Sequence, residues 1–347
     1  MSSTASTRIP STLYPLSPST LDEEPVQEKA LGGEKSFRLE RRSERHHSGP
    51  LNIYRSISWI LGFRDKYSLL NGFVWGGALV GFCLARSVTM NPTPAKISAQ
   101  LVPGEWFWFQ EPMYKYNLFI HIYLTTLGGL GAPLQFFPAM RRRAVVLHRL
   151  NGYGVLFCLI VGNICGSIIA RRTIGGELNV QSGYYLLGIM VVVSGILGFY
   201  YVKKDTRQHR KWMLRMVSYF AAVITARVCM LAACEIITDI GTYFSIWRCD
   251  EIINLLPDPN AVQSSFPQCV GVNTASVWAA VHASTRDGPL HKASAVRATM
   301  GMALWIATFL HIVGVEYYIH KTEAANQVRL GFALEPLDFV EDSMTSY

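Results

Sequence analysis

Charged residues are scarce in this sequence, and the motifs of several common enzyme classes are absent from it. Lysine, arginine, aspartate and glutamate make up 16% of the 347 residues, whereas hydrophobic residues make up 50%. The chain contains no Gly-rich phosphate loop, no Cys-x-x-Cys pair, no His-Glu-x-x-His and no Gly-x-Ser-x-Gly. It therefore offers no sign of a P-loop nucleotide hydrolase, a zinc protease or a serine hydrolase. The low charge and high hydrophobicity favour a membrane protein instead.

Six apolar stretches are long enough to cross a bilayer, which takes about 20 residues in a helix. We expect these spans at about residues 69–88, 116–137, 150–170, 184–202, 213–237 and 298–319. The predicted fold class is therefore all-α, a polytopic transmembrane helix bundle of six spans. A seventh, polar span at 240–256 is the alternative and would reverse the last helix. Arg248, Asp250 and Glu251 crowd its centre, so we expect a half-helix outside the bilayer there.

The remaining parts of the chain are tails and loops. Residues 1–50 are rich in serine, proline and charge, which predicts a disordered tail. The bundle takes residues 51–320 and includes one long loop at 238–297. Residues 321–347 form a second polar tail.

The net charge of +8 comes from clusters of basic residues between the spans, so it indicates membrane topology rather than nucleic-acid binding. The linkers near 139–149 and 203–215 hold four and six arginines or lysines, whereas those near 88–114 and 173–182 hold one and none. Positive linkers stay in the cytoplasm, so we expect both termini in the cytoplasm and the long loop in the lumen. In that compartment Cys249 and Cys269 are expected to form a disulfide, with two free thiols as the alternative.

Polar residues inside the spans mark the first candidate site. Arg227 lies about three turns into the fifth span, Glu235 lies two turns further, and His121 and Asn163 lie in the second and third spans. Charges in a bilayer are costly, so such side chains usually face a bundle interior or a wet cavity. Arg227 is interpreted as a group that holds an oxygen-rich ligand, or as a structural ion pair. His121 is a candidate proton donor, or a helix-to-helix hydrogen bond.

The loop segment that begins at Trp247 marks the second candidate site. On a helix, Trp247, Asp250 and Asn254 would form one polar stripe with Glu251 beside them. If the stripe folds over the mouth of the bundle, its carboxyl groups approach the polar residues of the spans. Two adjacent acids repel each other when both are ionised, so we expect one to stay protonated and to donate a proton. An exposed lumenal helix would show the same pattern.

Three segments carry a family resemblance: FIHIYLTTLGGLGAPLQFF, RRRAVVLHRLNGYG and RQHRKWMLRMVSYFAAVITAR. The motif positions are His121, Gln135, His148, Arg149, Gly152, His209, Trp212, Met213, Arg215 and Arg227. Over about residues 115–230 the chain resembles an uncharacterised integral-membrane family of bacteria and fungi, a domain of unknown function. Its fungal branch is similar to membrane-bound cyclases of meroterpenoid pathways that form macrophorins and ascochlorins. The resemblance implies acid-initiated cyclisation of a terminal olefin or epoxide on a farnesylated aromatic or epoxycyclohexenone, in the endoplasmic reticulum.

The resemblance and the polar residues together predict an integral-membrane terpene cyclase that uses no cofactor and no metal. It lacks the aspartate-rich motifs of soluble terpene cyclases, and its expected partners are membrane lipid and a lipophilic prenylated substrate. The predicted catalytic groups are Asp250, Glu251 and His121. The predicted substrate-binding residues are Arg227, Asn163, Glu235, Trp247 and Asn254. The alternatives are a small-molecule transporter and a haem- or quinone-linked oxidoreductase that uses His121, His148, His209 or His311.

Overall fold

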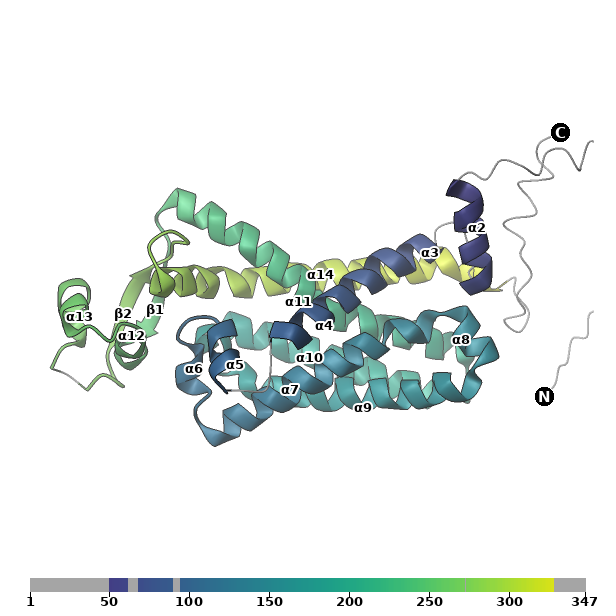
Figure 1. Cartoon of the computed structure of the whole chain (residues 1–347), viewed down its shortest axis with the longest axis horizontal. Coiled ribbons are helices and arrows are strands. Elements are labelled where there is room, and N and C mark those ends of the chain that lie inside the picture. Colours follow the sequence, from purple (N-terminus) through teal and green to yellow (C-terminus); the bar gives the residue numbers. More distant parts are fainter. Residues whose placement is uncertain (1–49, 62–67, 90–93, 272, 328–347) are drawn as a thin grey trace, which may run out of the picture. The chain divides into compact units, whose positions relative to one another are not determined.

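The computed structural model describes residues 50–61, 68–89, 94–271 and 273–327. Two compact units divide the chain after residue 54, and the second unit, residues 55–347, contains the membrane helices (Figure 1). The predicted disordered tail lies outside the described residues except for Pro50, which begins helix α2 (Pro50–Leu61). The second predicted tail begins too early at 321, because the last helix continues to Gln327. Residues 328–347 lie outside the described part.

The prediction of an all-α polytopic bundle is confirmed, and five described helices are long and apolar enough to cross a membrane. The first is a continuous helix formed by α3 (Ser68–Asn71), the π-turn η1 (Gly72–Gly76) and α4 (Gly77–Thr89). The others are α9 (Val145–Ala170), α10 (Leu178–Tyr201), α11 (Thr206–Ile240) and α14 (Pro289–Gln327).

The remaining predicted span, at about 116–137, coincides with α7 (Pro112–Gly131) and the 3-10 turn η2 (Pro133–Phe136). The 20 residues of α7 give a length of about 30 Å, which matches the hydrocarbon core of a bilayer. Its composition is less apolar than that of the five helices above, and Pro133 ends it because proline cannot donate the next helical hydrogen bond. The short helices α5 (Pro94–Gln100), α6 (Glu105–Trp108) and α8 (Pro138–Arg143) complete the connections around it.

Small residues let the helices approach closely. The helix α7 packs along α9, α9 packs along α10, and α11 packs along both α10 and α14. A Cβ at Gly128 of α7 would lie 2.8 Å from a methyl group of Leu159, and one at Gly162 of α9 would lie 2.8 Å from Thr125. Larger side chains would separate these helices, so the glycines permit the tight α7–α9 contact that membrane bundles use.

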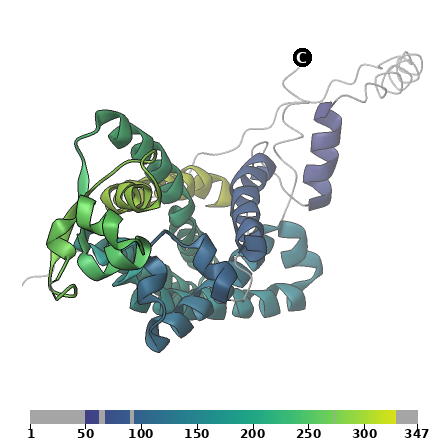
Figure 2. The ribbon, with the colours of Figure 1, turned by 60° about the vertical axis from the view of Figure 1, so that its left-hand side comes forward.

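The long loop folds into a disulfide-closed cap at one end of α14 (Figure 2). Strands β1 (Phe244–Arg248) and β2 (Trp278–His282) pair antiparallel and contact α14, and α12 (Cys249–Leu255), α13 (Pro259–Ser265) and the turn η4 (Pro267–Cys269) lie between them in sequence. The predicted disulfide Cys249–Cys269 is confirmed.

The two expectations for residues 240–256 need correction. Burial alternates along FSIWR, with every second side chain facing inward, and this is the period of a strand rather than of a helix. A seventh span is therefore wrong, and the expected half-helix begins only at Cys249. The polar helical stripe is also wrong, because Trp247 lies on β1 whereas Asp250 and Asn254 lie on α12.

Candidate functional site

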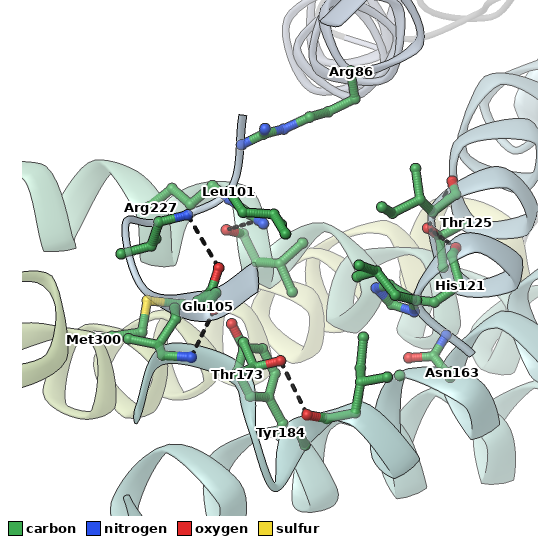
Figure 3. A pocket seen from close by; sticks show the side chains of 18 of the residues that line it. Arg86, Leu101, Glu105, His121, Thr125, Asn163, Thr173, Tyr184, Arg227 and Met300 are labelled. Atoms are coloured by element: carbon green, nitrogen blue, oxygen red, sulfur yellow. Dashed lines mark hydrogen bonds between the residues drawn. The ribbon is translucent and has the colours of Figure 1, made fainter. Parts of the chain in front are cut away.

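A cavity of about 390 Å³ lies between α4, α6, α7, α9, α10 and α11 (Figure 3). This volume falls in the usual range for small-molecule sites. Much of its wall is apolar and includes Phe82, Phe109, Leu118, Val223 and Met300. A few polar side chains converge on it, among them Arg86, Glu105, His121, Asn163, Tyr184 and Arg227. An apolar chamber with a small polar set is the usual form of a ligand site.

Glu105 is the acidic side chain of the cavity wall. It is 6% exposed, and its two carboxyl oxygens accept hydrogen bonds from the backbone N–H groups of Val102, at 3.1 Å, and Ile174, at 2.7 Å. Burial raises the pKa of Glu105, and the two N–H groups and the charges of Arg297 and Arg227 oppose that rise. The structure therefore fixes the carboxyl in a place where its protonated form is favoured relative to water.

Backbone turns that need glycine hold Glu105 in position. Gly104 precedes it with φ +88°, and a Cβ there would lie 2.9 Å from the Trp247 ring. The partner loop η3 (Thr173–Gly176) contains Gly175 at φ +78°, where a Cβ would meet the Cδ of Arg297 at 2.6 Å. Both positions disfavour other residues because of their backbone conformation and because Trp247 and Arg297 pack directly on them.

Two guanidinium groups lie at the same cavity. Arg227 of α11 and Arg86 of α4 both approach the ring of Phe82, with their Cζ atoms 5.2 and 5.5 Å from its centroid. Arg227 also donates to the carbonyl of Val223 at 3.3 Å. These two guanidinium groups outnumber the one carboxyl, Glu105, on the cavity wall, which suits an oxygen-rich or anionic group of a ligand.

His121 and Asn163 line another part of the wall, with Thr125 beside them in Figure 3. His121 Nδ1 lies 2.7 Å from the carbonyl of Gly162, and Asn163 donates to the carbonyl of Leu159 at 2.6 Å. A carbonyl can only accept, so Nδ1 of His121 carries a proton. In the neutral ring Nε2 then bears the lone pair and can accept a proton. The histidine thus makes a helix-to-helix hydrogen bond and also belongs to the cavity.

The structure does not bring Asp250 and Glu251 to this cavity. Asp250 pairs with Arg248 at the start of α12. Glu251 pairs with Arg297, both side chains being 3% exposed, and its Oε1 accepts from Trp108 Nε1 at 3.0 Å. Each predicted acid is thus engaged by an arginine, Asp250 by Arg248 of β1 and Glu251 by Arg297 of α14.

These two pairs belong to one cluster of stacked rings and guanidinium groups beneath the cap. The ring of Trp108 has the guanidinium carbons of Arg172 and Arg248 at 3.7 and 4.4 Å from its centroid. Arg297 lies 3.4 Å from the centroid of the fully buried Trp247 ring. Trp108 and Glu105 lie on the same short helix, α6. The contacts of Trp108 with this cluster therefore also fix the position of Glu105.

The other predicted residues are divided between the cavity and the rest of the unit. His121, Asn163 and Arg227 come together at the cavity, whereas Glu235, Trp247 and Asn254 do not line it. Glu235 accepts a hydrogen bond from Thr285 at 3.2 Å, and Asn254 is exposed on α12. Sequence reasoning missed Glu105, Arg86 and Tyr184. The signal for Glu105 was one acid directly before the aromatic run Trp106–Phe109, in a linker with little charge.

Of the histidines in the described residues, only His121 lines the cavity. His311 lies between α14 and α11, with Nε2 2.8 Å from the hydroxyl of Thr225. His209 Nδ1 lies 2.8 Å from the carbonyl of Gly198, and His148 lies near His209. The structure therefore offers no facing pair of histidines at the cavity for a haem.

Sequence comparisons relate the chain to one membrane family and one biosynthetic protein. Residues 118–250 match the model of a family described as predicted membrane protein (DUF2306). A protein of Aspergillus versicolor called Ava biosynthesis cluster protein G is 22% identical over 235 residues, covering 58% of this chain and 68% of that protein. No solved structure shows a significant match. The predicted resemblance to an uncharacterised membrane family is confirmed, and with the five apolar helices it identifies a multi-pass integral membrane protein.

Proposed function

We propose that the protein is an integral-membrane terpene cyclase that acts on a farnesylated aromatic or epoxycyclohexenone in fungal meroterpenoid biosynthesis. The observation that carries this proposal is a buried carboxyl with a raised pKa, Glu105, on the wall of a largely apolar cavity. The similarity to a protein of an Aspergillus biosynthesis cluster supports a biosynthetic role.

Glu105 starts the reaction in this proposal. As a carboxylic acid it gives its proton to the terminal olefin, so that the O–H bond breaks, a C–H bond forms and a tertiary carbocation results. With an epoxide, the proton goes to the epoxide oxygen while the C–O bond at the tertiary carbon breaks. Burial raises the pKa of the carboxyl, which favours the protonated form before the reaction. Apolar walls also exclude water, which would quench the cation early.

The cavity then folds the chain and ends the reaction. The internal olefins attack the cation in turn and form new C–C bonds along the apolar wall. His121 takes a proton from the carbon next to the final cation, so that a C–H bond breaks and an alkene forms. Its Nε2 is the available acceptor because Nδ1 is held by the carbonyl of Gly162. Solvent restores both proton states, so the net reaction is an isomerisation that needs no reductant or oxidant.

Arg227 and Arg86 hold the oxygenated head group. Guanidinium groups keep their protons and donate several hydrogen bonds in one plane, so they orient a hydroxyl or carbonyl without acting as acids. Asn163 adds a polar contact on the wall that carries His121. The prenyl chain enters from the surrounding lipid, since it is itself a membrane-soluble hydrocarbon.

In this proposal Glu105 takes the role that was predicted for Asp250 or Glu251 from the sequence. Both of those carboxylates face arginines, and neither lines the cavity. In this proposal Glu251 holds α6 through Trp108 and pairs with Arg297, and Asp250 pairs with Arg248, which stacks on the Trp108 ring. We further propose an endoplasmic reticulum membrane with both termini in the cytoplasm. The disulfide Cys249–Cys269 supports a lumenal cap, because disulfides persist in oxidising compartments.

Microsomes from cells that express the full chain provide the test. Incubation with a farnesylated aromatic, as the olefin or as the terminal epoxide, should give a cyclic product of the same mass with no added cofactor. Microsomes without the chain are the control. If the olefin and epoxide substrates both remain unchanged, the proposal is wrong.

The haem-linked oxidoreductase remains a second candidate because of one observation. Nδ1 of His148 is buried without a hydrogen-bond partner in the described residues, and His209 lies near it. A Soret band in the purified protein that disappears in the double substitution His148→Ala and His209→Ala would favour this function. Conversion that depends on an added electron donor would favour it as well.

A further inference from the structure

Two histidines and an aspartate meet at the end of the β1–β2 pair opposite Arg248. His282 ends β2, Asp287 lies in the following loop, and His291 lies in the first turn of α14. One potential metal-ligand atom from each residue lies within 4.8 Å of the other two. His282 Nδ1 and Asp287 Oδ2 lie 3.4 Å apart. None of the three residues lines the cavity described above.

Backbone carbonyls fix the state of both histidine rings. His282 Nε2 lies 3.1 Å from the carbonyl of Gly241, and His291 Nδ1 lies 2.9 Å from the carbonyl of His282. Each of these nitrogens must donate, because a carbonyl has no proton to give. In the neutral rings the lone pairs are then on Nδ1 of His282 and Nε2 of His291. Metal-bound histidines are usually held in this way, with the other ring nitrogen donating to a carbonyl or carboxylate.

The spacing and charge also suit a small divalent cation. Two ligand atoms about 2.0–2.2 Å from a tetrahedral zinc ion lie about 3.3–3.6 Å apart, and the 3.4 Å between His282 and Asp287 falls in this range. Asp287 supplies a carboxylate, which is an ordinary anionic ligand of zinc, beside the two imidazoles. Arg286, the nearest cation in sequence, is engaged by Asp239 at 2.6 Å.

We propose that His282, Asp287 and His291 bind one divalent transition-metal ion, with zinc as the best fit. Three nitrogen and oxygen ligands leave a fourth position for water. Asp287 is 52% exposed, so the ion can enter from solvent. The bound ion would join β2 to the start of α14 and, through Gly241, to the end of α11. The ion therefore has a structural role, in which it fixes the cap to the helices. This role is separate from that of the proposed acid, Glu105.

The test uses the full chain purified in detergent, stripped with EDTA and titrated with zinc sulfate in a calorimeter. We expect one zinc ion per chain, and a loss of affinity of about 100-fold or more in Asp287→Ala and in His291→Ala, because even indirect partners of a metal site contribute about 10- to 100-fold. Cobalt in place of zinc should give visible absorption bands that the same two substitutions remove.

The matched control is His320→Ala, which removes an exposed histidine near the other end of α14. It should bind zinc as the wild type does. Asp287→Ala keeps the test decisive if a histidine variant fails to fold, because its side chain is largely in solvent. The proposal is overturned if the wild type binds no zinc, in which case the three residues form an ion pair only. It is also overturned if Asp287→Ala binds zinc with unchanged affinity.

Discussion

Replacing Glu105 with glutamine separates the chemistry of the acid from its place in the structure. Glutamine has nearly the same shape but has no ionisable proton to give to an olefin. A positioned general acid contributes about 10²- to 10⁴-fold to a rate, or roughly 3–5.5 kcal/mol of the barrier. We therefore expect Glu105→Gln to lower kcat by at least about 100-fold.

The substitution should affect stability much less than activity. The two carboxyl oxygens of Glu105 accept backbone N–H groups from Val102 and Ile174, and glutamine offers one acceptor oxygen and one NH₂ group in their place. One buried N–H group is left without its acceptor, which costs about 1–3 kcal/mol. The cavity and the helices around it should stay intact, so the variant should still insert and remain soluble in detergent.

The pH dependence gives an independent signature of this residue. The folded pKa of Glu105 is raised above its unfolded value, so between the two values the folded state binds more protons than the unfolded state. Stability therefore falls as pH rises through this window. Activity should fall as pH rises through the folded pKa, because the acid is lost. In the Glu105→Gln variant, the fall of stability with rising pH should be absent, and so should the pH-dependent cyclisation activity.

The assay follows product formation from the farnesylated substrate by chromatography and mass spectrometry over a range of pH. The matched control is Glu111→Gln, which removes an exposed glutamate six residues away that makes no side-chain cap for α7. If Glu105→Gln cyclises the substrate at the wild-type rate, Glu105 is not the acid. A thermal melting curve of both variants distinguishes loss of chemistry from loss of fold.

Four further predictions follow from other contacts. Arg227→Gln should raise KM by about 10- to 100-fold with a smaller change in kcat, since a hydrogen bond to a charged group contributes about 1.5–3 kcal/mol; an unchanged KM would remove it from the binding site. Glu251→Gln should lower the melting temperature, because breaking a buried ion pair costs about 3–5 kcal/mol, and Asp250→Asn should do so less. Neither of these two substitutions should lower kcat in the folded protein. If one of them lowers kcat by about 100-fold, the residue that it replaces is the acid instead of Glu105. Cys269→Ser should destabilise the cap by about 3 kcal/mol, since the bond closes a sequence separation of 20 residues, and equal protease resistance with and without it would contradict this. A cysteine placed at Asn260 should react with an impermeant label only from the lumenal side of microsomes; labelling from the cytoplasmic side alone would reverse the topology.

The spans could be predicted from the sequence because their signal is local. A helix in lipid must be apolar over about 20 consecutive residues, so composition within a short window is enough to find it. The same physics indicated that Arg227, His121 and Asn163 face the interior, and all three line the cavity. Each lies on a long helix whose course is set by its own residues. The inward orientation of these three residues could therefore be predicted without knowing which helices are neighbours.

Glu105 could not be found in this way because its environment is built by distant residues. Its carboxyl accepts a hydrogen bond from the N–H group of Ile174, 69 positions away. The Trp247 ring, also distant in sequence, packs on the neighbouring Gly104. In the linker itself, an acid beside an aromatic run indicates only a membrane surface. For Asp250 and Glu251, the local sequence likewise does not show which partners the fold supplies. Two adjacent acids predict repulsion if they are alone, whereas the fold supplies Arg248 and Arg297 to each in turn. The proton state of a carboxyl depends on which charges the tertiary structure places against it, and the local sequence does not contain that information.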